Sequence, residues 1–465
     1  MLQANQGRPV PVKDARPHLL YVAWGFPPCR SGGVYRALAT ANAFARDGWD
    51  VTVLTIERDL WDRRTGADPA LEEQVDSRVR VDRIPFDWPL LEDDLSQWPA
   101  LRALTPRAWV KARTTLDQLA FPEKVYGPWR RHLERAAERI HADHPVDLVV
   151  ATTNPQVAIT AAMHLAERHH IPYVVDYRDA WSLDVFSGRR VHREGSRVHK
   201  WERRALEGAQ EVWFVNEPIR EWHRDAYAAA ASLMHVVANG YDEPADQSAA
   251  KPNAEPAIEA AAQARKNAPL RFSYVGTISA KVPVPELVAG WRRAREQEPL
   301  LTDAHADLYG YLGFYGAANP ELAAALSAGA ELDVRYRGPV SKTLVGDVYA
   351  ASDALLLVLG TGLYVTSGKV FEYMATGLPI ISVHDPGNDA SKVLAGYPLW
   401  FPATDMSPDG VAAALQAGAR AAATVAPGSR AAARAFAERY SREHQLVPRI
   451  AALRAVVGAS RVETN

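Results

Sequence analysis

The sequence has very little cysteine: Cys29 is the only one in 465 residues. A single cysteine excludes an intramolecular disulfide framework and any cysteine-rich zinc site. Such a composition suits a reducing compartment, so we expect a cytoplasmic protein. Cys29 lies in a loop without a neighbouring histidine that could activate its thiol, so we assign it no nucleophilic role.

The chain also lacks an excess of charge of either sign. Its 53 Lys and Arg residues against 55 Asp and Glu residues leave a net charge of −2. A sequence-independent nucleic-acid binder needs a basic surplus, so we expect no nucleic-acid partner. Long apolar runs are missing too, since residues 19–24 and 354–360 fall far short of the roughly 20 residues that span a bilayer. The polar residues 1–17 lack the apolar core of a secretory signal and are interpreted as a flexible N-terminal arm.

Several motifs of catalysis and cofactor binding are absent from the sequence. The fourteen histidines form neither an HExxH pair nor a Cys/His cluster, and no GxSxG elbow occurs. The acidic run 92–94 is interpreted as a solvated loop. Neither GxGxxG nor a Walker A loop is present, which disfavours a dinucleotide or ATP site of the usual kind. We therefore expect no bound metal and no cofactor.

What the sequence does contain is a repeated alternation of apolar strands and amphipathic helices. With 48% hydrophobic and 23% charged residues, the chain has the composition of a globular protein. Its length suggests two or three domains. In the first half the pattern predicts strands at 18–24, 51–55, 147–153, 172–179, 211–216 and 234–240, with helices at 34–48 and 158–170 and one reaching about 227. Apolar strands alternating with helices are typical of a parallel sheet covered on both faces.

Residues 243–269 interrupt this alternation with four prolines, many alanines and no large apolar cluster, which is typical of a linker. The alternation then resumes, with strands predicted at 271–277, 306–313, 333–338, 354–360 and 378–384 and helices at about 285–298 and 369–377. We therefore predict an α/β fold of two facing, Rossmann-like, doubly wound domains with a cleft between them. The expected limits are 18–245, a linker at 246–269, and 270–435, followed by a helix at 436–465 that crosses back to the first domain.

Residues 56–135 do not follow the alternation and form an excursion from the first domain. They contain five tryptophans, and residues 101–137 carry eight Lys and Arg against three Asp and Glu. One interpretation is an acceptor-binding element or one that makes weak contact with a membrane surface. The other, which we favour, is a set of helices that pack beside the sheet with solvated outer faces.

Three loops that follow predicted strands carry candidate ligand-binding residues, because parallel sheets bind ligands at the carboxyl ends of their strands. In GFPPCRSGG, Gly32 and Gly33 precede a helix and permit close approach of a ligand. Asp176 and Arg178 lie near the carboxyl end of the predicted strand 172–179, where such charges either bind a ligand or join loops by ion pairs. Lys281 follows the strand at 271–277 and could neutralise an anion, although a lone exposed lysine is as good an explanation.

The strongest motif is TSGKVFEYMATGLPII, residues 366–381. Thr366, Ser367 and Gly368 stand at a helix start, where free amides and the helix dipole attract anions. With Lys369, these groups could hold a diphosphate. Glu372 lies nearly one turn further on, and its carboxylate would suit the paired hydroxyls of a ribose. The plainer alternative is a helix cap followed by a surface glutamate.

Taken together, these segments resemble the retaining, GT-B-fold glycosyltransferases related to family four. The resemblance runs from about residue 18 to the tail and rests on FPPCRSGG, VVDYRDAWSL, WERRALEGAQEVWFVN, VVANGYDE, FSYVGT and SGKVFEYMATGLPII. It implies that a nucleotide-diphosphate sugar is the co-substrate, bound mainly by the second domain. It also implies that a small polar acceptor (a sugar, cyclitol, thiol or natural-product precursor) binds in the first. The family retains anomeric configuration and needs no metal, because cations and a helix dipole stabilise the leaving diphosphate.

The resemblance also implies roles for individual residues. Glu372 matches the glutamate that binds the donor ribose, and Lys281 roughly matches a phosphate-binding lysine. The candidate catalytic residues are Lys281, Lys369, Arg178 and Asp176. The candidate donor-binding residues are Gly32, Gly33, Gly276, Thr277, Val340, Ser341, Tyr364, Val365, Thr366, Ser367, Gly368 and Glu372, and the candidate acceptor-binding residues are Asn154, Asp179 and Trp181.

Two positions differ from the usual family pattern. Tyr364 stands where a second glutamate is usual, and Thr277 stands where an arginine is usual. Alternatives to glycosyl transfer therefore stay open. One is a nucleotide-sugar 2-epimerase or hydrolase on the same fold, and another is a non-catalytic partner subunit that binds sugar nucleotides.

Overall fold

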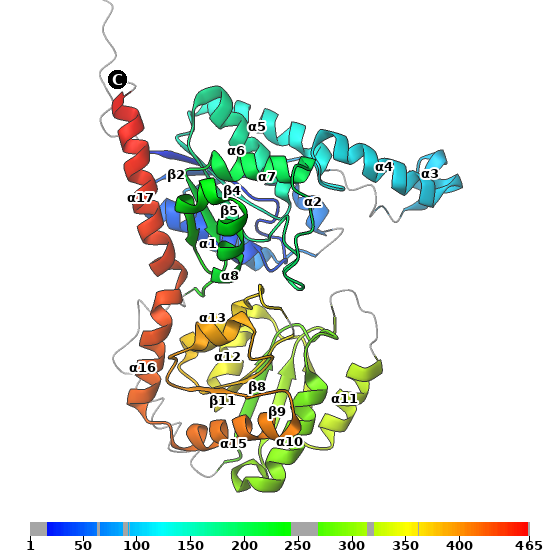
Figure 1. Ribbon diagram of the computed structural model, residues 1–465, viewed down its shortest axis with the longest axis vertical. Coiled ribbons are helices and arrows are strands. Elements are labelled where there is room, and N and C mark those ends of the chain that lie inside the picture. The colour runs from blue at the N-terminus through cyan, green and yellow to red at the C-terminus, as the bar shows by residue number, and fades with distance from the viewer. Residues whose placement is uncertain are drawn as a thin grey trace, which may run out of the picture.

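The computed structural model describes residues 16–62, 66–86, 92, 94–242, 268–313, 320–360 and 362–463. Most of the expected N-terminal arm (1–17) and nearly all of the expected linker (246–269) lie outside these residues. Figure 1 shows two α/β units stacked along the long axis of the molecule. The interpretation as two facing, doubly wound α/β domains is confirmed.

The N-terminal unit is built on a parallel sheet in which, among the described residues, seven strands lie in the order β3-β2-β1-β4-β5-β6-β7. β1 and β4 occupy its centre and are buried along their whole length, as expected when helices cover both faces. The strands are β1 (His18–Val22), β2 (Asp50–Ile56), β3 (Val79–Ile84), β4 (Leu148–Thr152), β5 (Tyr173–Tyr177), β6 (Glu211–Phe214) and β7 (Met234–Val236).

Helices cover both faces of this sheet because alternate strand residues are apolar on each face. α5 (Arg130–Asp143) and α6 (Ile159–His169) share one apolar core with Leu20 and Val22 of β1. α1 (Val34–Arg46) shares the opposite core with Leu19 and Tyr21. The other helices of this unit are α2 (Arg58–Leu60), α3 (Ala100–Leu104), α4 (Pro106–Ala120), α7 (Arg197–Glu207) and α8 (Glu217–Ala226).

The C-terminal unit repeats this architecture around the strand order β10-β9-β8-β11-β12-β13. The strands are β8 (Arg271–Val275), β9 (His305–Tyr309), β10 (Val334–Gly338), β11 (Ala354–Val358), β12 (Ile380–Val383) and β13 (Trp400–Pro402). One face is covered by α10 (Val284–Gln297), α11 (Pro320–Ala330) and α15 (Pro408–Thr424). The opposite face is covered mainly by α13 (Gly368–Thr376), α14 (Asp389–Leu394) and α16 (Pro427–Ala437), with α12 (Val345–Ala350) near the sheet edge.

Short 3-10 helices connect these elements: η2 (Pro69–Gln74), η4 (Leu95–Gln97), η5 (Gly127–Trp129), η6 (Gln156–Ala158), η7 (Ala228–Leu233), η9 (Pro299–Leu301), η10 (Lys342–Leu344) and η11 (Glu438–Tyr440). The region 56–135 proves more regular than its sequence indicates. β3 extends the sheet by pairing with β2 along six residues. Its mixed charge concealed the strand, because an edge strand buries only part of its surface. α3 and α4 project sideways from the unit (Figure 1).

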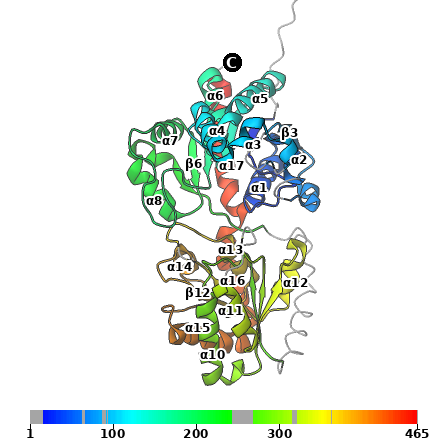
Figure 2. The ribbon, with the colours of Figure 1, turned by 90° about the vertical axis from the view of Figure 1, so that its right-hand side faces the viewer.

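The last helix, α17 (Arg442–Glu463), lies along the N-terminal unit, although α16 just before it packs on the C-terminal unit (Figures 1 and 2). Leu446, Ile450 and Leu453 of α17 are buried in the core that α1 also lines. Arg454 and Arg461 pair with Asp47 and Asp147 at 2.7 Å each. The chain therefore passes between the units at two places, after β7 and before α17.

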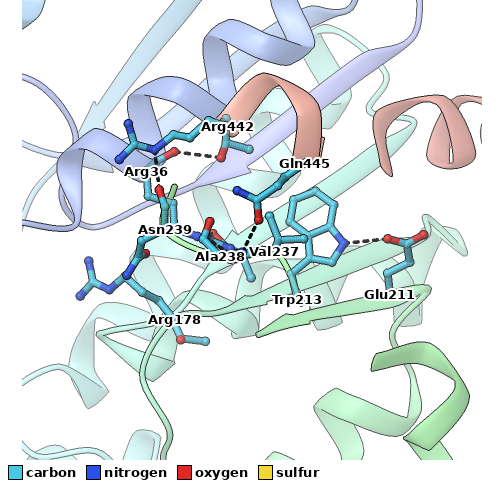
Figure 3. A network of polar contacts seen from close by, with 12 residues as sticks. Arg36, Arg178, Glu211, Trp213, Val237, Ala238, Asn239, Arg442 and Gln445 are labelled. Atoms are coloured by element: carbon cyan, nitrogen blue, oxygen red, sulfur yellow. Dashed lines mark hydrogen bonds and ion pairs between the residues drawn. The ribbon is translucent and has the colours of Figure 1, made fainter. Parts of the chain in front are cut away.

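These two passages are tied together by polar contacts to the backbone (Figure 3). Arg442 Nε donates to the carbonyl of Asn239 at 2.7 Å, and the amide of Ala238 donates to Gln445 Oε1 at 2.7 Å. Arg36 of α1 joins them, because its Nη1 donates to the carbonyls of Val237 at 2.7 Å and Ala238 at 3.1 Å. The passage after β7 is thus fixed by side chains from both ends of the sequence.

Arg36 is itself held by Asp176 at the end of β5. Its Nη2 lies 2.6 Å from Asp176 Oδ1, and both side chains are almost fully buried. A buried charge is tolerated only where it is paired and its hydrogen bonds are satisfied. The pair therefore links α1, β5 and the passage between the units.

Replacing Arg36 by methionine should destabilise the protein by about 3–5 kcal/mol, because Asp176 would stay buried without a partner. Urea unfolding followed by tryptophan fluorescence measures this loss. Arg454→Ala is the matched control, since it breaks a half-exposed pair to Asp47 and should cost about 0–1 kcal/mol. Equal losses in the two variants would contradict the role given to Arg36.

Candidate active site

A cleft of about 1280 Å³ is lined by residues of both units. Its walls are mostly loops at the carboxyl ends of strands, as expected for parallel sheets. The N-terminal side contributes Arg30, Gly32, Tyr35, Asp68, Phe186 and Asn239. The C-terminal side contributes Gly276, Thr277, Lys281, Val340, Ser341, Lys342, Val365, Ser367, Gly368, Lys369 and Glu372. Eleven of the residues selected from the sequence therefore line this cleft: Gly32 and all of the latter group except Lys342.

The start of α13 forms the centre of the C-terminal wall. Ser367 occupies the N-cap position, and its side chain makes no capping hydrogen bond. The first amides of a helix have no partner within the helix and carry its positive dipole end. Ser367, Gly368 and Lys369 all line the cleft. This wall has the features of an anion-binding surface.

Lys369 crosses the wall directly over Gly276. A Cβ at residue 276 would lie 1.8 Å from the Cε of Lys369, so only glycine leaves room for the lysine. Lys369 Nζ donates to the hydroxyl of Tyr274 at 2.9 Å. Burial lowers the pKa of Lys369 to about 8, against an opposing effect of the Glu372 charge. An anion at this place would restore the charged form.

Glu372 lies one turn along α13 and is paired with a lysine that the sequence motifs did not reveal. Lys342 Nζ lies 2.7 Å from Glu372 Oε1, and the hydroxyl of Tyr349 donates to Oε2 at 3.3 Å. The ammonium of Lys342 also lies 5.3 Å from the ring centroid of Tyr35, which belongs to the N-terminal unit. Lys342 lies four residues after the end of β10. Because ligands bind at the carboxyl ends of parallel strands, this position was the sequence feature that could have indicated a site residue.

Two further contacts span the cleft. Arg30 Nη2 donates to the hydroxyl of Tyr311 at 2.9 Å. Lys281 Nζ lies 3.5 Å from the ring centroid of Phe186, so an aromatic side chain of one unit faces a cation of the other. Arg30, Tyr35 and Phe186 were not selected from the sequence, because only the closed arrangement of the two units brings them to the second wall.

The predicted residues after β4 and β5 form a second polar group beside the N-terminal wall. Arg178 lies against Gly33, since a Cβ there would be 1.3 Å from its Nη1. Arg178 Nη2 pairs with Asp179 Oδ2 at 3.0 Å, and Asn154 Nδ2 donates to the same oxygen at 2.6 Å. Trp181 stands apart from them, stacked on Phe121 at 5.1 Å.

Glu123, which the sequence did not single out, holds the turn next to this group. Its carboxylate accepts the amides of Gln156 at 2.9 Å and Val157 at 2.8 Å. Burial raises the pKa of Glu123 to about 7, which the two amides oppose. Glu123 therefore fixes the turn that carries Asn154.

Three predicted site residues have protein partners instead of facing the cleft. Asp176 is fully buried and holds Arg36, which fits the structural alternative considered for it and leaves it no direct contact with a ligand. Thr366 donates to Asp389 and accepts from Asn216 Nδ2 at 3.0 Å. Asn216 Nδ2 also donates to the carbonyl of Tyr364 at 2.9 Å. These contacts join the two units beside the cleft.

Two kinds of feature are absent from the described residues. Within the described ranges, no three His, Cys, Asp or Glu side chains are grouped so that they could hold a metal ion. In the acidic run 92–94, Asp94 accepts the amide of Ser96 at 2.9 Å, as a cap of η4, and Asp93 lies outside the described residues. No helix in the described part of the chain is long and apolar enough to cross a membrane.

Comparison with solved structures identifies the fold. The structure is similar to a glycosyltransferase from Rickettsia africae ESF-5, with a TM-score of 0.64 and 11% identity over 95% of this chain and 99% of that one. It is also similar to sucrose-phosphate synthase from Thermosynechococcus elongatus (TM-score 0.59, 15% identity, 96% and 100% covered). A third is the UDP-forming α,α-trehalose-phosphate synthase from Burkholderia xenovorans (TM-score 0.57, 11% identity, 94% and 100% covered). The molecule is therefore a GT-B-fold protein.

Comparison with protein families identifies a domain in the first half of the chain. Residues 31–240 match the family described as Glycosyl transferase 4-like domain. No curated protein sequence matches the chain. Residues 31–240 therefore contain a glycosyl transferase 4-like domain, within a chain that has the GT-B fold. The resemblance noted from the sequence motifs is confirmed.

The lowered pKa of Lys369 makes a prediction about stability. Between about pH 8 and its usual pKa near 10.4, Lys369 is neutral in the folded protein and charged in the unfolded chain. The free energy of unfolding should therefore rise with pH in this window, by up to about 1.4 kcal/mol per pH unit.

Lys369→Met, which removes the titrating group, is the comparison for this prediction. Urea unfolding of both proteins from pH 7 to pH 10 gives the difference between them at each pH. The wild type should gain stability relative to the variant as the pH rises. Parallel profiles would show that Lys369 is not buried as the structure has it.

Proposed function

We propose that the C-terminal wall of the cleft binds a nucleotide-diphosphate sugar. The observation that carries this proposal is the convergence, in one cleft, of the start of α13, three lysines and Glu372. The diphosphate would lie at Ser367, Gly368 and Lys369, within reach of Lys281. Val340, Ser341 and Thr277 would surround the nucleoside, and Val365 would border the sugar. Glu372 would accept hydrogen bonds from the ribose hydroxyls, either beside its ion pair with Lys342 or in place of it.

We further propose that the acceptor enters from the N-terminal wall. Arg178, Asp179 and Asn154 supply a linked group of donors and acceptors there, with Trp181 behind them. A small polar acceptor would suit this group. Gly32 and Gly33 would let the loop after β1 approach the donor closely, with Arg178 filling the space beside Gly33.

The reaction in this proposal is transfer with retention at the anomeric carbon. The bond from that carbon to the diphosphate oxygen breaks with its electron pair, and the diphosphate leaves, stabilised by Lys281, Lys369 and the α13 amides. The acceptor oxygen forms the new bond from the same face, and its proton passes to an oxygen of the leaving diphosphate. Asp176 takes no direct part, because it is occupied by Arg36.

The experiment that tests this function is a donor panel with candidate acceptors. Release of the nucleoside diphosphate, and NMR of the new anomeric centre, measure transfer and its stereochemistry. We expect transfer with retention, unchanged by a chelator. Inversion would contradict the proposed reaction, and interconversion of the donor sugar would favour an epimerase. Tight donor binding without turnover would favour a non-catalytic partner subunit, and free sugar as the only product a hydrolase.

A sharper prediction concerns Glu372. In Glu372→Gln the carboxylate that would accept both ribose hydroxyls is replaced by an amide, and hydrogen bonds to charged groups contribute about 1.5–3 kcal/mol. Calorimetric titration should therefore show nucleoside-diphosphate affinity falling about tenfold or more.

The control for this change is Glu331→Gln, at an exposed position after α11. It should leave affinity unchanged. A 2′,3′-dideoxynucleotide separates ribose binding from a general loss of structure. The wild type should prefer the ribonucleotide, and Glu372→Gln should lose most of that preference. If the preference persists in the variant, Glu372 does not bind the ribose.

A further inference from the structure

α3 and α4 form a projection that exposes leucines and buries charged residues, whereas an ordinary surface helix does the reverse. Leu101 and Leu104 of α3 are 63% and 80% exposed, and Leu116 and Leu119 of α4 are 61% and 66% exposed. The buried side chains on these two helices are instead Arg102 and Asp117. Amphipathic helices normally turn their apolar stripe toward the protein.

Polar contacts explain why the leucines point outward. The guanidinium of Arg102 lies 3.8 Å from the ring centroid of Trp98 and 5.1 Å from that of Trp109, so this sandwich joins α3 to α4. Further along α4, Arg113 Nε donates to Asp117 Oδ1 at 2.9 Å. Asp117 also packs closely against Gly127 of η5. The inner side of the projection is thus held by charged and aromatic residues.

The exposed leucines form one stripe on each helix. Leu101 and Leu104 are three residues apart on α3, as are Leu116 and Leu119 on α4, which puts each pair on one helical face. Ala108 and Ala112, eight and four residues before Leu116, are exposed and continue the α4 stripe. Figure 1 shows both helices standing out from the body of the N-terminal unit, on the side away from α17.

The charge beside the α4 stripe is positive. α4 contains Arg107, Lys111 and Arg113 against one acidic residue, Asp117, whereas the acidic residues Glu92 and Asp94 precede α3. Arg113 is paired with Asp117 and Arg102 lies between the tryptophans, whereas Arg107 and Lys111 are exposed and one turn apart. Arg107 and Lys111 thus flank the α4 stripe on one side, which is the pattern of a helix that lies on an anionic lipid surface.

We propose that α3 and α4 dock the protein on an anionic membrane surface, with the four leucines in the apolar boundary and Arg107 and Lys111 at the headgroups. A second copy of the chain fits this surface less well. Two such stripes packed together would bring Arg107 and Lys111 near their own copies, with no exposed acidic residue on these helices to pair with them. The proposal holds whether or not the proposed transfer reaction is correct.

Flotation of the full chain with vesicles tests this proposal. The probes are phosphatidylcholine alone and phosphatidylcholine mixed with phosphatidylglycerol. The wild type should float with the anionic vesicles and bind the neutral ones more weakly. Leu116→Glu with Leu119→Glu should reduce binding about tenfold or more, because two large apolar side chains leave the lipid boundary.

A matched control carries the same change of charge elsewhere. Leu300→Glu with Val447→Glu alters two residues that are 40% and 53% exposed outside the projection, and it should bind as the wild type does. Arg107→Glu with Lys111→Glu should abolish the preference for anionic vesicles. Circular dichroism and thermal unfolding of each variant show that the fold is kept.

Three outcomes would overturn the proposal: wild-type protein that binds neither vesicle, a leucine variant that binds as the wild type does, and a leucine effect matched by the control pair. Light scattering after size exclusion, without lipid, tests the rival occupant. A dimer that dissociates in the leucine variant would show that a second copy covers the stripe.

Discussion

The arrangement of the two units depends on the buried ion pair between Arg36 and Asp176. Asp176 lies near the end of β5 and Arg36 lies in the first turn of α1. Nη1 of Arg36 also holds the carbonyls of Val237 and Ala238, where the chain leaves the N-terminal unit. Because neither charge can be left unpaired in the interior, these three segments are fixed relative to each other. Arg442 and Gln445 add the start of α17 to the same junction.

This junction determines where the cleft lies and what faces it. With the passage after β7 held, the carboxyl ends of both sheets point toward each other. Tyr35, Phe186 and Arg30 of one unit then contact Lys342, Lys281 and Tyr311 of the other. The lysines of this wall are held by aromatic faces, and Lys342 is also held by Glu372. A near-neutral chain thereby presents a locally positive wall.

Much of the fold was predictable because the signal is local. Short apolar runs followed by amphipathic helices define parallel strands, and the predicted strands agree with the structure in both units. β3 and β13 were not predicted, since edge strands bury little and carry no clear apolar pattern. The α13 motif was also predictable, because cap, lysine and glutamate lie within one helical turn or two.

The rest of the candidate site was not predictable, since it depends on contacts between residues far apart in the sequence. Lys342 meets Glu372 across 30 positions, and Lys281 meets Phe186 from the opposite unit. The role of Asp176 was left open for this reason: a position near the end of a strand fits a ligand site as well as an ion pair, and only the structure shows that Arg36 occupies the carboxylate. Similarly, the region of tryptophans and basic residues gave no sign that its leucines face outward.

By itself, the sequence determined the class of fold, the division into two units and the polar motif at the start of α13, because strand periodicity, loop composition and helix caps are properties of neighbouring residues. Only the tertiary structure decided which charged side chains pair with each other in the interior and which face the cleft. Whether a charged side chain binds a ligand or another residue depends on its desolvation and on its partner, and both are set by the packing of distant segments.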